Sequence, residues 1–509
     1  MNRNGNLIAD GAVEVYMTST EKAKDMSWYK QPIEMANKLS QKDSLPLTAV
    51  DGLDMTTITV NPSKEYQKIL GFGTSLEEST INNMLKLTPE LQDEFLRKLI
   101  DPKQAGMTLL RVTIGTSDFT AKRFYTYYDA AELTEENAII EDGKLVPDWY
   151  NVTGKGFSIQ KDHDYKIIDT IKKVQALAEE YGVEDEVRFF ASSWTPPGWM
   201  KVETQTSKKH ADNELMLKAG ALNDEYIDDL AKYYTRYLEE YAKLGISIYA
   251  MTLQNEPRLE INYPSCAMDG IQEGKLVIAL KKAIQESEVL TPEQKQIKLW
   301  AYDHNASEAY AFTEELLSVE GANEVLDGIA FHDYSGDLSV MQQVYDELLN
   351  KGERKDQVVN LTERSVWGTT GANSIITYLR NSAISYNSWV TMLDSNVGLH
   401  QWVGTPDPSM FAREADSDSV YWAMPEYYIS GQFSRFIKPG YVRVASDEGS
   451  TETIRNVVFK NPKTNELVAV VVNDTEEEQT FKFVCEEKQF VGAIPAKHVA
   501  TYVWTVPEQ

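Results

Sequence analysis

Two glutamates lie at the ends of apolar stretches of the sequence, where carboxylates are unusual. Glu256 directly follows Ser247–Asn255 (SIYAMTLQN), and Glu363 lies near the end of Val358–Arg364 (VVNLTER). A carboxylate at the end of a buried strand is costly unless it is exposed in a site or paired with a cation. Glycoside hydrolysis needs two carboxylates that flank one bond, so the pair predicts that chemistry. The alternative is that each glutamate only forms an ion pair with a nearby arginine.

The part of the chain that carries both glutamates alternates between strand-like and helix-like segments, from about residue 69 to about residue 436. In stretches such as Asp164–Tyr181 and Asp224–Leu244, apolar residues recur at three- and four-residue spacing, which is typical of amphipathic helices. Eight strand-then-helix units predict an α/β fold, a closed (β/α)8 TIM barrel, whose site lies at the carboxyl ends of the strands. The expected strands are Ile69–Gly73, Thr108–Gly115, Val187–Trp194, Ser247–Asn255, Ile297–Asn305, Gly328–Tyr334, Val358–Arg364 and Ser385–Asp394.

The pattern changes after Pro439 and Gly440, where short strands follow one another without helices between them. This pattern predicts an attached antiparallel β-sandwich. Ala12–Ser19 and Met55–Val60 alternate in the same way, so we expect residues 1–65 to add strands to this sandwich, with the barrel at 66–437 and the rest of the sandwich at 438–509. The strands expected at the C-terminal end are Tyr441–Ser446, Ile454–Asn461, Glu466–Asn473, Gln479–Cys485, Phe490–Ala496 and Val499–Val506.

The charge of the chain disfavours several classes of partner. Against 50 lysines and arginines stand 78 aspartates and glutamates, which gives a net charge of −28. Such a field repels nucleic acids and anionic membranes, so we expect no nucleic-acid partner. No apolar run approaches the roughly 18 residues that span a bilayer, so we expect no integral membrane association. The expected partner is a carbohydrate or glycoconjugate substrate, and the oligomeric state stays open.

The cysteines and histidines predict neither a disulfide framework nor a metal site. Only Cys266 and Cys485 are present, and the six histidines form no HExxH motif. We therefore expect no metal and no other cofactor. The opening residues lack the apolar core of a signal peptide. Two compartments stay open: the cytoplasm, or the outside of the cell with the signal peptide absent from this sequence.

Ordered motifs run along nearly the whole chain and together resemble those of glycoside hydrolase family 30, the glucosylceramidase-like branch of the (β/α)8 glycosidases. The motifs are Gly71-Phe72-Gly73, Leu110-Arg111-Val112 with Ser117-Asp118-Phe119, Ala191–Pro197 (ASSWTPP) with Trp199-Met200-Lys201, Gln254–Pro257 (QNEP), His332-Asp333-Tyr334 and Gln432–Gly440 (QFSRFIKPG).

The resemblance implies a retaining β-glycosidase in which Glu363 is the nucleophile and Glu256 the acid/base. The pKa of Glu256 is then expected to be raised by burial and by the charge of Glu363. Asn255 would bind the sugar 2-hydroxyl, Tyr334 would orient the nucleophile, and the other groups would bind or support the sugar. The residues expected around the substrate are Asn255, Asp118, Phe119, Trp194, Tyr334, His332, Arg111 and Trp389. For Trp194 and His332, the alternatives are an ordinary core aromatic and a hydrogen-bonded structural histidine.

Departures from the family pattern leave the sugar open. Gly73–Glu78 reads GTSLEE where relatives often read GGA, and Asp333 replaces a tryptophan. Relatives also carry W-x-D-W-N on the eighth strand, and here Met392 takes the position of the second tryptophan. The expected substrate is a β-glucoside, either glucosylceramide-like or a β-1,6-glucan. A β-xylosidase or xylan-active enzyme, a β-fucosidase and a non-catalytic carbohydrate-binding barrel remain alternatives.

Overall fold

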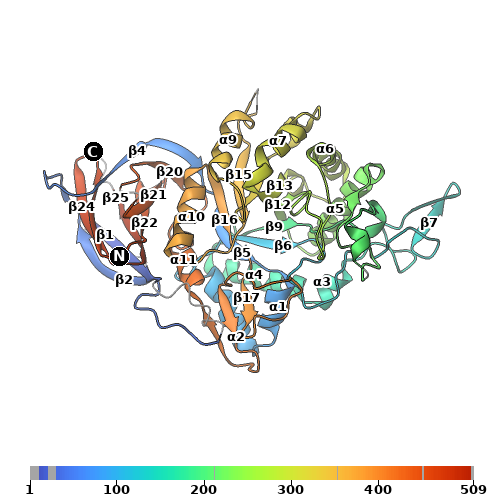
Figure 1. The fold of residues 1–509 in the computed structure, drawn as a ribbon, viewed down its shortest axis with the longest axis horizontal. Coiled ribbons are helices and arrows are strands. Elements are labelled where there is room, and N and C mark those ends of the chain that lie inside the picture. The colour runs from blue at the N-terminus through green and yellow to red at the C-terminus, as the bar shows by residue number, and fades with distance from the viewer. Residues whose placement is uncertain (1–10, 21–29, 211, 352–353, 450–451, 506–509) are drawn as a thin grey trace.

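In the computed structural model, eight parallel strands close into a barrel (Figure 1). The structure describes residues 11–20, 30–210, 212–351, 354–449 and 452–505. The predicted (β/α)8 barrel is confirmed, and each of the eight predicted strands overlaps an observed one. In order around the barrel the strands are β5 (Gly71–Ser75), β6 (Leu109–Thr113), β9 (Arg188–Ser192), β12 (Ile248–Thr252), β13 (Lys298–Asn305), β14 (Gly328–His332), β15 (Val358–Glu363) and β16 (Ala383–Asn387).

Helices connect successive strands and cover the outside of the barrel. Local signals set their ends: Asp269 and Gln272 form a capping box at the start of α6, and Gly182, with a φ of 67°, ends α4 in the left-handed conformation that glycine tolerates. The helices are α1 (Glu78–Leu85), α2 (Pro89–Ile100), α3 (Gln160–Asp164), α4 (Ile167–Tyr181), α5 (Ile227–Lys243), α6 (Gly270–Glu286), α7 (Ala309–Leu317), α8 (Ala322–Val325), α9 (Ser339–Glu347), α10 (Gly368–Arg380) and α11 (Pro425–Ser434).

The inside of the barrel changes from apolar to polar along the strands. Leu109, Phe190, Ala250, Trp300 and Ala330 form one buried apolar cluster. Because side chains on a strand alternate between its two faces, the residue two positions further along points to the same side. On four of these strands that next residue is polar and buried: Arg111, Ser192, Thr252 and His332. The apolar layer therefore supports a polar layer at the carboxyl end of the barrel.

Strands from both ends of the chain form one ten-stranded sheet that folds into the sandwich beside the barrel (Figure 1). β1 pairs with β25, and β4 pairs with both β20 and β23. All pairs are antiparallel except β4 with β23, which is parallel. The strands are β1 (Ala12–Ser19), β2 (Ser40–Pro46), β3 (Thr48–Ala49), β4 (Thr57–Lys68), β20 (Val442–Ser446), β21 (Ile454–Lys460), β22 (Glu466–Asn473), β23 (Gln479–Cys485), β24 (Lys488–Ile494) and β25 (His498–Thr505). Val506, the expected end of the last strand, lies outside the described residues, as does the opening segment 1–10.

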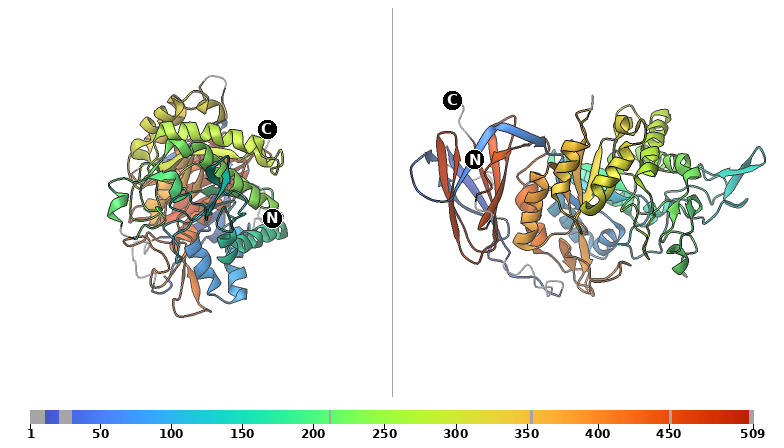
Figure 2. Two further views of the ribbon diagram at one scale, coloured as in Figure 1. Left: turned by 90° about the vertical axis from the view of Figure 1, so that its right-hand side faces the viewer. Right: turned by 45° about the horizontal axis from the view of Figure 1, so that its top comes forward.

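The sandwich packs against α10 and α11 of the barrel, as two further views show (Figure 2). The Arg380 side chain at the end of α10 donates a hydrogen bond of 2.8 Å to the carbonyl of Asn456 on β21. On the other side of this interface, the Thr501 hydroxyl donates to the carbonyl of Gln432 at 2.7 Å. Among the described residues, no helix has the length and apolar composition that a membrane crossing needs.

Three small sheets branch from the barrel. The predicted eighth strand, Ser385–Asp394, is not continuous: β16 ends at Asn387, and Met392–Asp394 forms β17 of a separate sheet. Phe411 of β18 then pairs with Met392, so the intervening segment 395–410 is held at both ends. The small sheets consist of β7 (Ala138–Glu141) with β8 (Lys144–Pro147), β10 (Lys201–Val202) with β11 (Ala221–Leu222), and β17 (Met392–Asp394) with β18 (Phe411–Arg413) and β19 (Tyr421–Ala423).

Candidate active site

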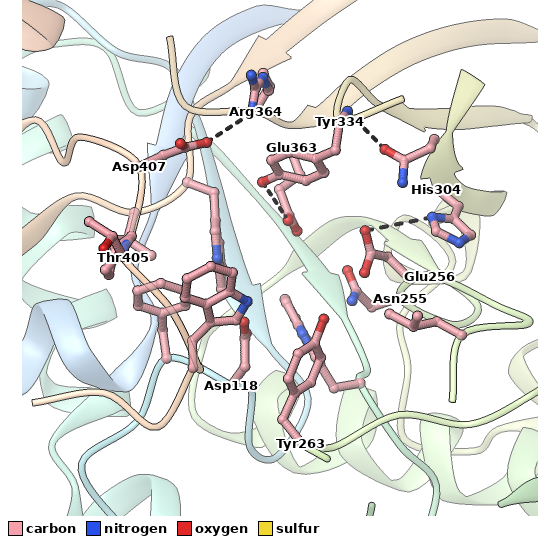
Figure 3. Close-up of a pocket in the computed structure, with 18 residues that line it drawn as sticks. Asp118, Asn255, Glu256, Tyr263, His304, Tyr334, Glu363, Arg364, Thr405 and Asp407 are labelled. Carbon is pink, nitrogen blue, oxygen red and sulfur yellow. Dashed lines mark hydrogen bonds and ion pairs between the residues drawn. The ribbon is translucent and has the colours of Figure 1, made fainter. Parts of the chain in front are cut away.

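Glu256 and Glu363 both line a cavity of about 430 Å³ at the carboxyl ends of the barrel strands (Figure 3). Glu256 follows β12 and Glu363 is the last residue of β15. A carboxylate oxygen of each, together with a ring nitrogen of His332, lies within 4.8 Å of the others. The structure therefore brings the two predicted glutamates together over one opening.

Arg111 lies beneath this opening and is fully buried. Its Nη1 donates to Oε2 of Glu363, and its Nη2 donates to Oδ1 of Asn255 at 2.9 Å and to Oδ2 of Asp303 at 2.9 Å. A guanidinium can only donate, so the contact identifies the Asn255 atom as the amide oxygen. The amide nitrogen of Asn255 is thereby left for another partner, and Arg111 pairs with two carboxylates, those of Glu363 and Asp303.

His332 joins three carboxylates in the same layer. Its Nδ1 lies 3.1 Å from Oε1 of Glu256, and its Nε2 lies 3.0 Å from Oδ1 of Asp303 and 3.7 Å from Oε2 of Glu363. Burial disfavours a charged ring, but the charges of Glu363 and Asp303 outweigh it and raise the pKa of His332 to about 10. At neutral pH the ring is therefore a buried cation.

The electrostatics of Glu256 differ from the sequence expectation. Burial raises the pKa of its carboxyl group, as expected, but the adjacent rings of His304 and His332 outweigh burial and hold the pKa below its usual range. The expectation of a raised pKa in the empty site is therefore wrong, because these two histidines lie closer to Glu256 than the sequence could indicate. The backbone of Glu256 has a φ of 48°, a strained conformation for a residue with a side chain.

Tyr334 contacts the other glutamate. Its hydroxyl donates to Oε1 of Glu363 at 2.9 Å, although its side chain extends to the rim and the residue is 41% exposed. Its backbone N–H donates to Oδ1 of Asn305 at 2.8 Å, which ties the Tyr334 loop to the end of β13. Both oxygens of Glu363 thus have partners, Arg111 on one and Tyr334 on the other.

Aromatic side chains form one wall of the cavity. Trp194 and Trp389 stack with ring centroids 5.0 Å apart, and Phe119 lies edge-on to Trp389 at 5.8 Å. Trp402 continues this wall from the segment 395–410, stacked on Phe119 at 6.4 Å. Met392 is buried in β17 and is not among the residues lining the cavity, whereas Trp389 is.

Asp118 also lines the cavity and is buried (Figure 3). Among the described residues, its buried Oδ1 has no hydrogen-bond partner. Burial, with added repulsion from Glu363 and Glu256, raises the pKa of Asp118 well above its usual value. A buried polar atom without a partner costs free energy, so this oxygen is suited to accept or donate a hydrogen bond to a ligand.

A family model for the glycosyl hydrolase family 30 TIM-barrel domain matches residues 69–437. The chain belongs to glycosyl hydrolase family 30. It is therefore a glycoside hydrolase, and its substrate is a carbohydrate.

Known family 30 proteins align with nearly the whole chain. The endo-1,6-β-D-glucanase neg1 of Aspergillus fumigatus is 24% identical over 468 residues, which cover 88% of this chain and 87% of the relative. Lysosomal acid glucosylceramidase of Mus musculus is 25% identical over 464 residues, which cover 88% of this chain and 83% of the relative. The solved structure of the endo-β1,6-glucanase BT3312 has a TM-score of 0.75 at 23% identity and covers 97% of this chain and 100% of its own.

The cavity is also lined by residues that lie outside the motifs used for the sequence prediction. The segment 395–410 reaches it because the Gln401 N–H donates to the carbonyl of Asp118 at 3.1 Å, and Arg364 forms an ion pair with Asp407 at 2.8 Å. Only the length of the loop after the eighth strand hinted at this segment. The lining residues absent from the sequence prediction are Leu259, Tyr263, His304, Asn305, Arg364, Val390, Trp402, Thr405, Pro406 and Asp407.

Proposed function

We propose that the protein is a retaining β-glycosidase in which Glu363 is the nucleophile and Glu256 the acid/base. The observation that carries this proposal is the short separation of the two carboxylates, with an oxygen of each within 4.8 Å of the other across one cavity. Retaining enzymes have carboxyl groups about 5–5.5 Å apart, whereas inverting enzymes need about 6.5–9.5 Å to admit a water molecule.

The partners of Glu363 fit its proposed task. Arg111 and Tyr334 hold both oxygens of Glu363, which keeps it aimed at the anomeric carbon. In the first step an oxygen of Glu363 bonds to that carbon while Glu256 gives its proton to the leaving oxygen. In the second step Glu256 takes a proton from water, the water oxygen bonds to the anomeric carbon, and Glu363 is released.

Asn255 and Asp118 are the proposed sugar-binding groups. The oxygen of the Asn255 amide is taken by Arg111, so its NH2 group is available to the sugar 2-hydroxyl. Asp118 has a free buried oxygen beside Trp194 and Trp389, whose faces suit the C–H side of a sugar ring. These groups support a sugar bound with its ring in the aromatic part of the cavity.

A β-glucoside with a saccharide leaving group is the proposed substrate, in particular a β-1,6-glucan. The printed activities of the relatives are those of an endo-1,6-β-D-glucanase and a glucosylceramidase. Beside apolar Leu259, Trp402 and Pro406, the cavity lining carries the Arg364–Asp407 ion pair and the polar side chains of His304 and Asn305. Burying an ion pair and polar groups under a lipid chain would be costly, so these groups support the glucan over the ceramide conjugate.

A substrate panel tests the proposal. Wild type, Glu256→Gln and Glu363→Gln are assayed on aryl β-glucoside, β-xyloside, β-fucoside and β-galactoside, on β-1,6-linked gluco-oligosaccharides and on glucosylceramide in detergent. We expect the β-glucosides to be turned over by wild type, and kcat/KM on the β-1,6-linked gluco-oligosaccharides to fall at least about a hundredfold in both variants. Glu314→Gln, on the exposed face of α7, is the matched control. Activity that survives in Glu363→Gln would exclude this nucleophile, and preference for a xyloside or fucoside would correct the sugar.

Azide rescue separates the two roles. Glu363→Gly vacates the face that the nucleophile attacks, so azide entering there should give the α-glycosyl azide. In Glu256→Ala, azide should instead attack the glycosyl-enzyme from the opposite face and give the β-glycosyl azide. Proton NMR of the products distinguishes the two, and the reverse assignment would exchange the two glutamates.

A further inference from the structure

The end of β13 carries a structural irregularity directly before the cavity. The register of β13 against β14 shifts between Tyr302 and His304. Tyr302 and Asp303 have φ values of 74° and 48°, in the left-handed region that side chains disfavour. Bulges of this kind re-aim side chains and recur next to active sites. Here the bulge lets two consecutive residues serve one site: Asp303 points into the barrel and His304 lines the cavity.

His304 faces Glu256 with an atom that has no other partner. Its Nδ1 lies 3.6 Å from Oε1 of Glu256, just beyond hydrogen-bond length (Figure 3). This Nδ1 is buried and has no hydrogen-bond partner among the described residues, although 17% of the side chain is exposed. Catalytic hydrogen bonds are often long in an empty site and shorten when substrate binds.

Both histidines contact the same oxygen of Glu256. His332 lies 3.1 Å from Oε1 and His304 lies 3.6 Å from it, on two neighbouring strands. No contact of this kind occupies Oε2 within the described parts of the chain. If Oε1 is held from two sides, Oε2 is the oxygen that can reach a bond in the cavity.

We propose that His304 is a positioning residue for the acid/base: together with His332 it holds Oε1 of Glu256, so that Oε2 exchanges the proton with the leaving oxygen and then with water. This inference rests on the proposed function. When the glycosidic bond breaks, Oε2 loses its proton to the leaving oxygen and Glu256 becomes a carboxylate. A donor on Oε1 stabilises that carboxylate and makes Glu256 a stronger acid.

Several other groups also act on Glu256, so the effect of His304 has to be measured as a difference between variants. The charged and titratable groups that face Glu256 are His304 and Tyr302 on β13, His332 on β14, Tyr334 after β14, Glu363 on β15, Asp118 after β6 and Tyr263 after β12. His304 itself is flanked by the rings of Tyr302 and His332, with centroids 5.8 Å and 6.4 Å away.

The test compares wild type, His304→Ala and His304→Asn on two β-glucosides, one with a good leaving group (dinitrophenyl) and one with a poor leaving group (a β-1,6-linked disaccharide). In His304→Ala, loss of the donor should raise the pKa of Glu256 and move the alkaline limb of kcat/KM upward by about one pH unit. At the optimum, kcat/KM should fall about tenfold for the disaccharide and much less for the dinitrophenyl glucoside, which needs little protonation. His304→Asn keeps a donor near the position of Nδ1, so it should recover part of the wild-type pH profile and part of the activity on the disaccharide. His163→Ala, on α3, is the matched control.

An unmoved alkaline limb and an equal loss on both substrates would overturn the proposal and leave His304 a structural residue. A second measurement does not need activity: the carboxyl carbon of Glu256, assigned by its absence in Glu256→Gln, is titrated by NMR in wild type and His304→Ala. An unchanged Glu256 pKa would again reject the role of His304. Failure of the proposed function has a different signature, because wild type would then hydrolyse neither glucoside, or Glu256→Gln would still hydrolyse the disaccharide as fast as wild type.

Discussion

Asp303 and Asp162 are both fully buried aspartates, but their partners shift their pKa values in opposite directions. Asp303, in the layer beneath the two glutamates, contacts two cations, Arg111 at 2.9 Å and His332 at 3.0 Å. Burial alone would raise the pKa of Asp303, but these charges outweigh it and hold the pKa far below its usual range. Asp303 is therefore ionised at any working pH.

Asp162, on α3, has hydroxyl groups as partners. The Tyr127 and Tyr241 hydroxyls donate to its Oδ2 at 2.5 and 2.7 Å, and that of Tyr125 donates to Oδ1 at 3.1 Å. Three hydrogen bonds from neutral donors do not offset burial, which raises the pKa of Asp162 to about 6.

The difference between the two clusters shows what distinguishes a site from a core network in this protein. Burial is the same for both aspartates, so burial by itself does not predict function. The cluster at the candidate site keeps Asp303 charged by placing cations beside it, and these cations also hold Glu256 and Glu363. The tyrosine cluster of Asp162 with Tyr125, Tyr127 and Tyr241 holds its aspartate mainly by hydrogen bonds from uncharged hydroxyls, and none of these four residues lines the cavity.

Removing the guanidinium should break the charged cluster most severely. Arg111→Met keeps the length of the side chain but leaves Asp303 and Glu363 buried without their main cation. We expect a loss of about 3–5 kcal/mol in the free energy of unfolding, as for other broken buried pairs, and a fall in kcat/KM of at least about a thousandfold. Thermal unfolding and kinetics on an aryl β-glucoside measure both.

Arg111→Lys provides the matched comparison. A lysine restores a charge, but its ammonium group cannot reach the four acceptors that the guanidinium contacts, which include Ser192 and Asn255. Most of the stability should therefore return while most of the activity stays lost. Near wild-type kcat/KM in Arg111→Lys would mean that charge alone, and not the forked contacts, matters here.

A smaller effect is expected when the charge of Asp303 is removed without changing its shape. In Asp303→Asn the pKa of His332 should fall, because Asp303 is one of the groups that raise it. The raised pKa of His332 stabilises the fold below about pH 6.5, and this contribution is lost as the pH rises through about 10. In Asp303→Asn this stabilising contribution of His332 should be lost at a lower pH than in wild type. At the same time kcat/KM should fall about a hundredfold. Unfolding measured from pH 6 to 10 checks the shift, and an unchanged pH dependence would contradict it.

The sequence predicts the barrel and the two glutamates because both depend on local patterns. Runs such as Leu109–Thr113 and Val358–Glu363 are buried on both faces, so they read as continuous apolar strands, and a carboxylate at the end of one is conspicuous. The position of a strand end also fixes which way the side chain points. The identity of the partners of Glu256 does not follow from such patterns.

Two features escaped prediction because long-range contacts determine them. The bulge at Tyr302 and Asp303 exists through pairing with β14, and no glycine there marks a left-handed backbone. Its consequence, two histidines on one carboxylate, reverses the expected pKa shift of Glu256. The segment 395–410 has no regular structure of its own, and its place over the cavity depends on hydrogen bonds to the loop after β6.

The tyrosine cluster supplies the prediction with the smallest effect on activity. Because the folded pKa of Asp162 is about 6 and lies above its unfolded value, the folded state binds more protons between about pH 4 and pH 6. Its contribution to the free energy of unfolding therefore falls as the pH rises through that window, by about 3 kcal/mol in total. Asp162→Asn does not titrate, so unfolding should depend less on pH between 4 and 6 than in wild type, while kcat/KM stays unchanged. Denaturant titrations at several pH values measure this, with Asp169→Asn on the exposed side of α4 as the control. If the free energy of unfolding of Asp162→Asn depends on pH as in wild type, Asp162 is ionised in the folded protein. The three hydroxyls would then suffice to hold its charge.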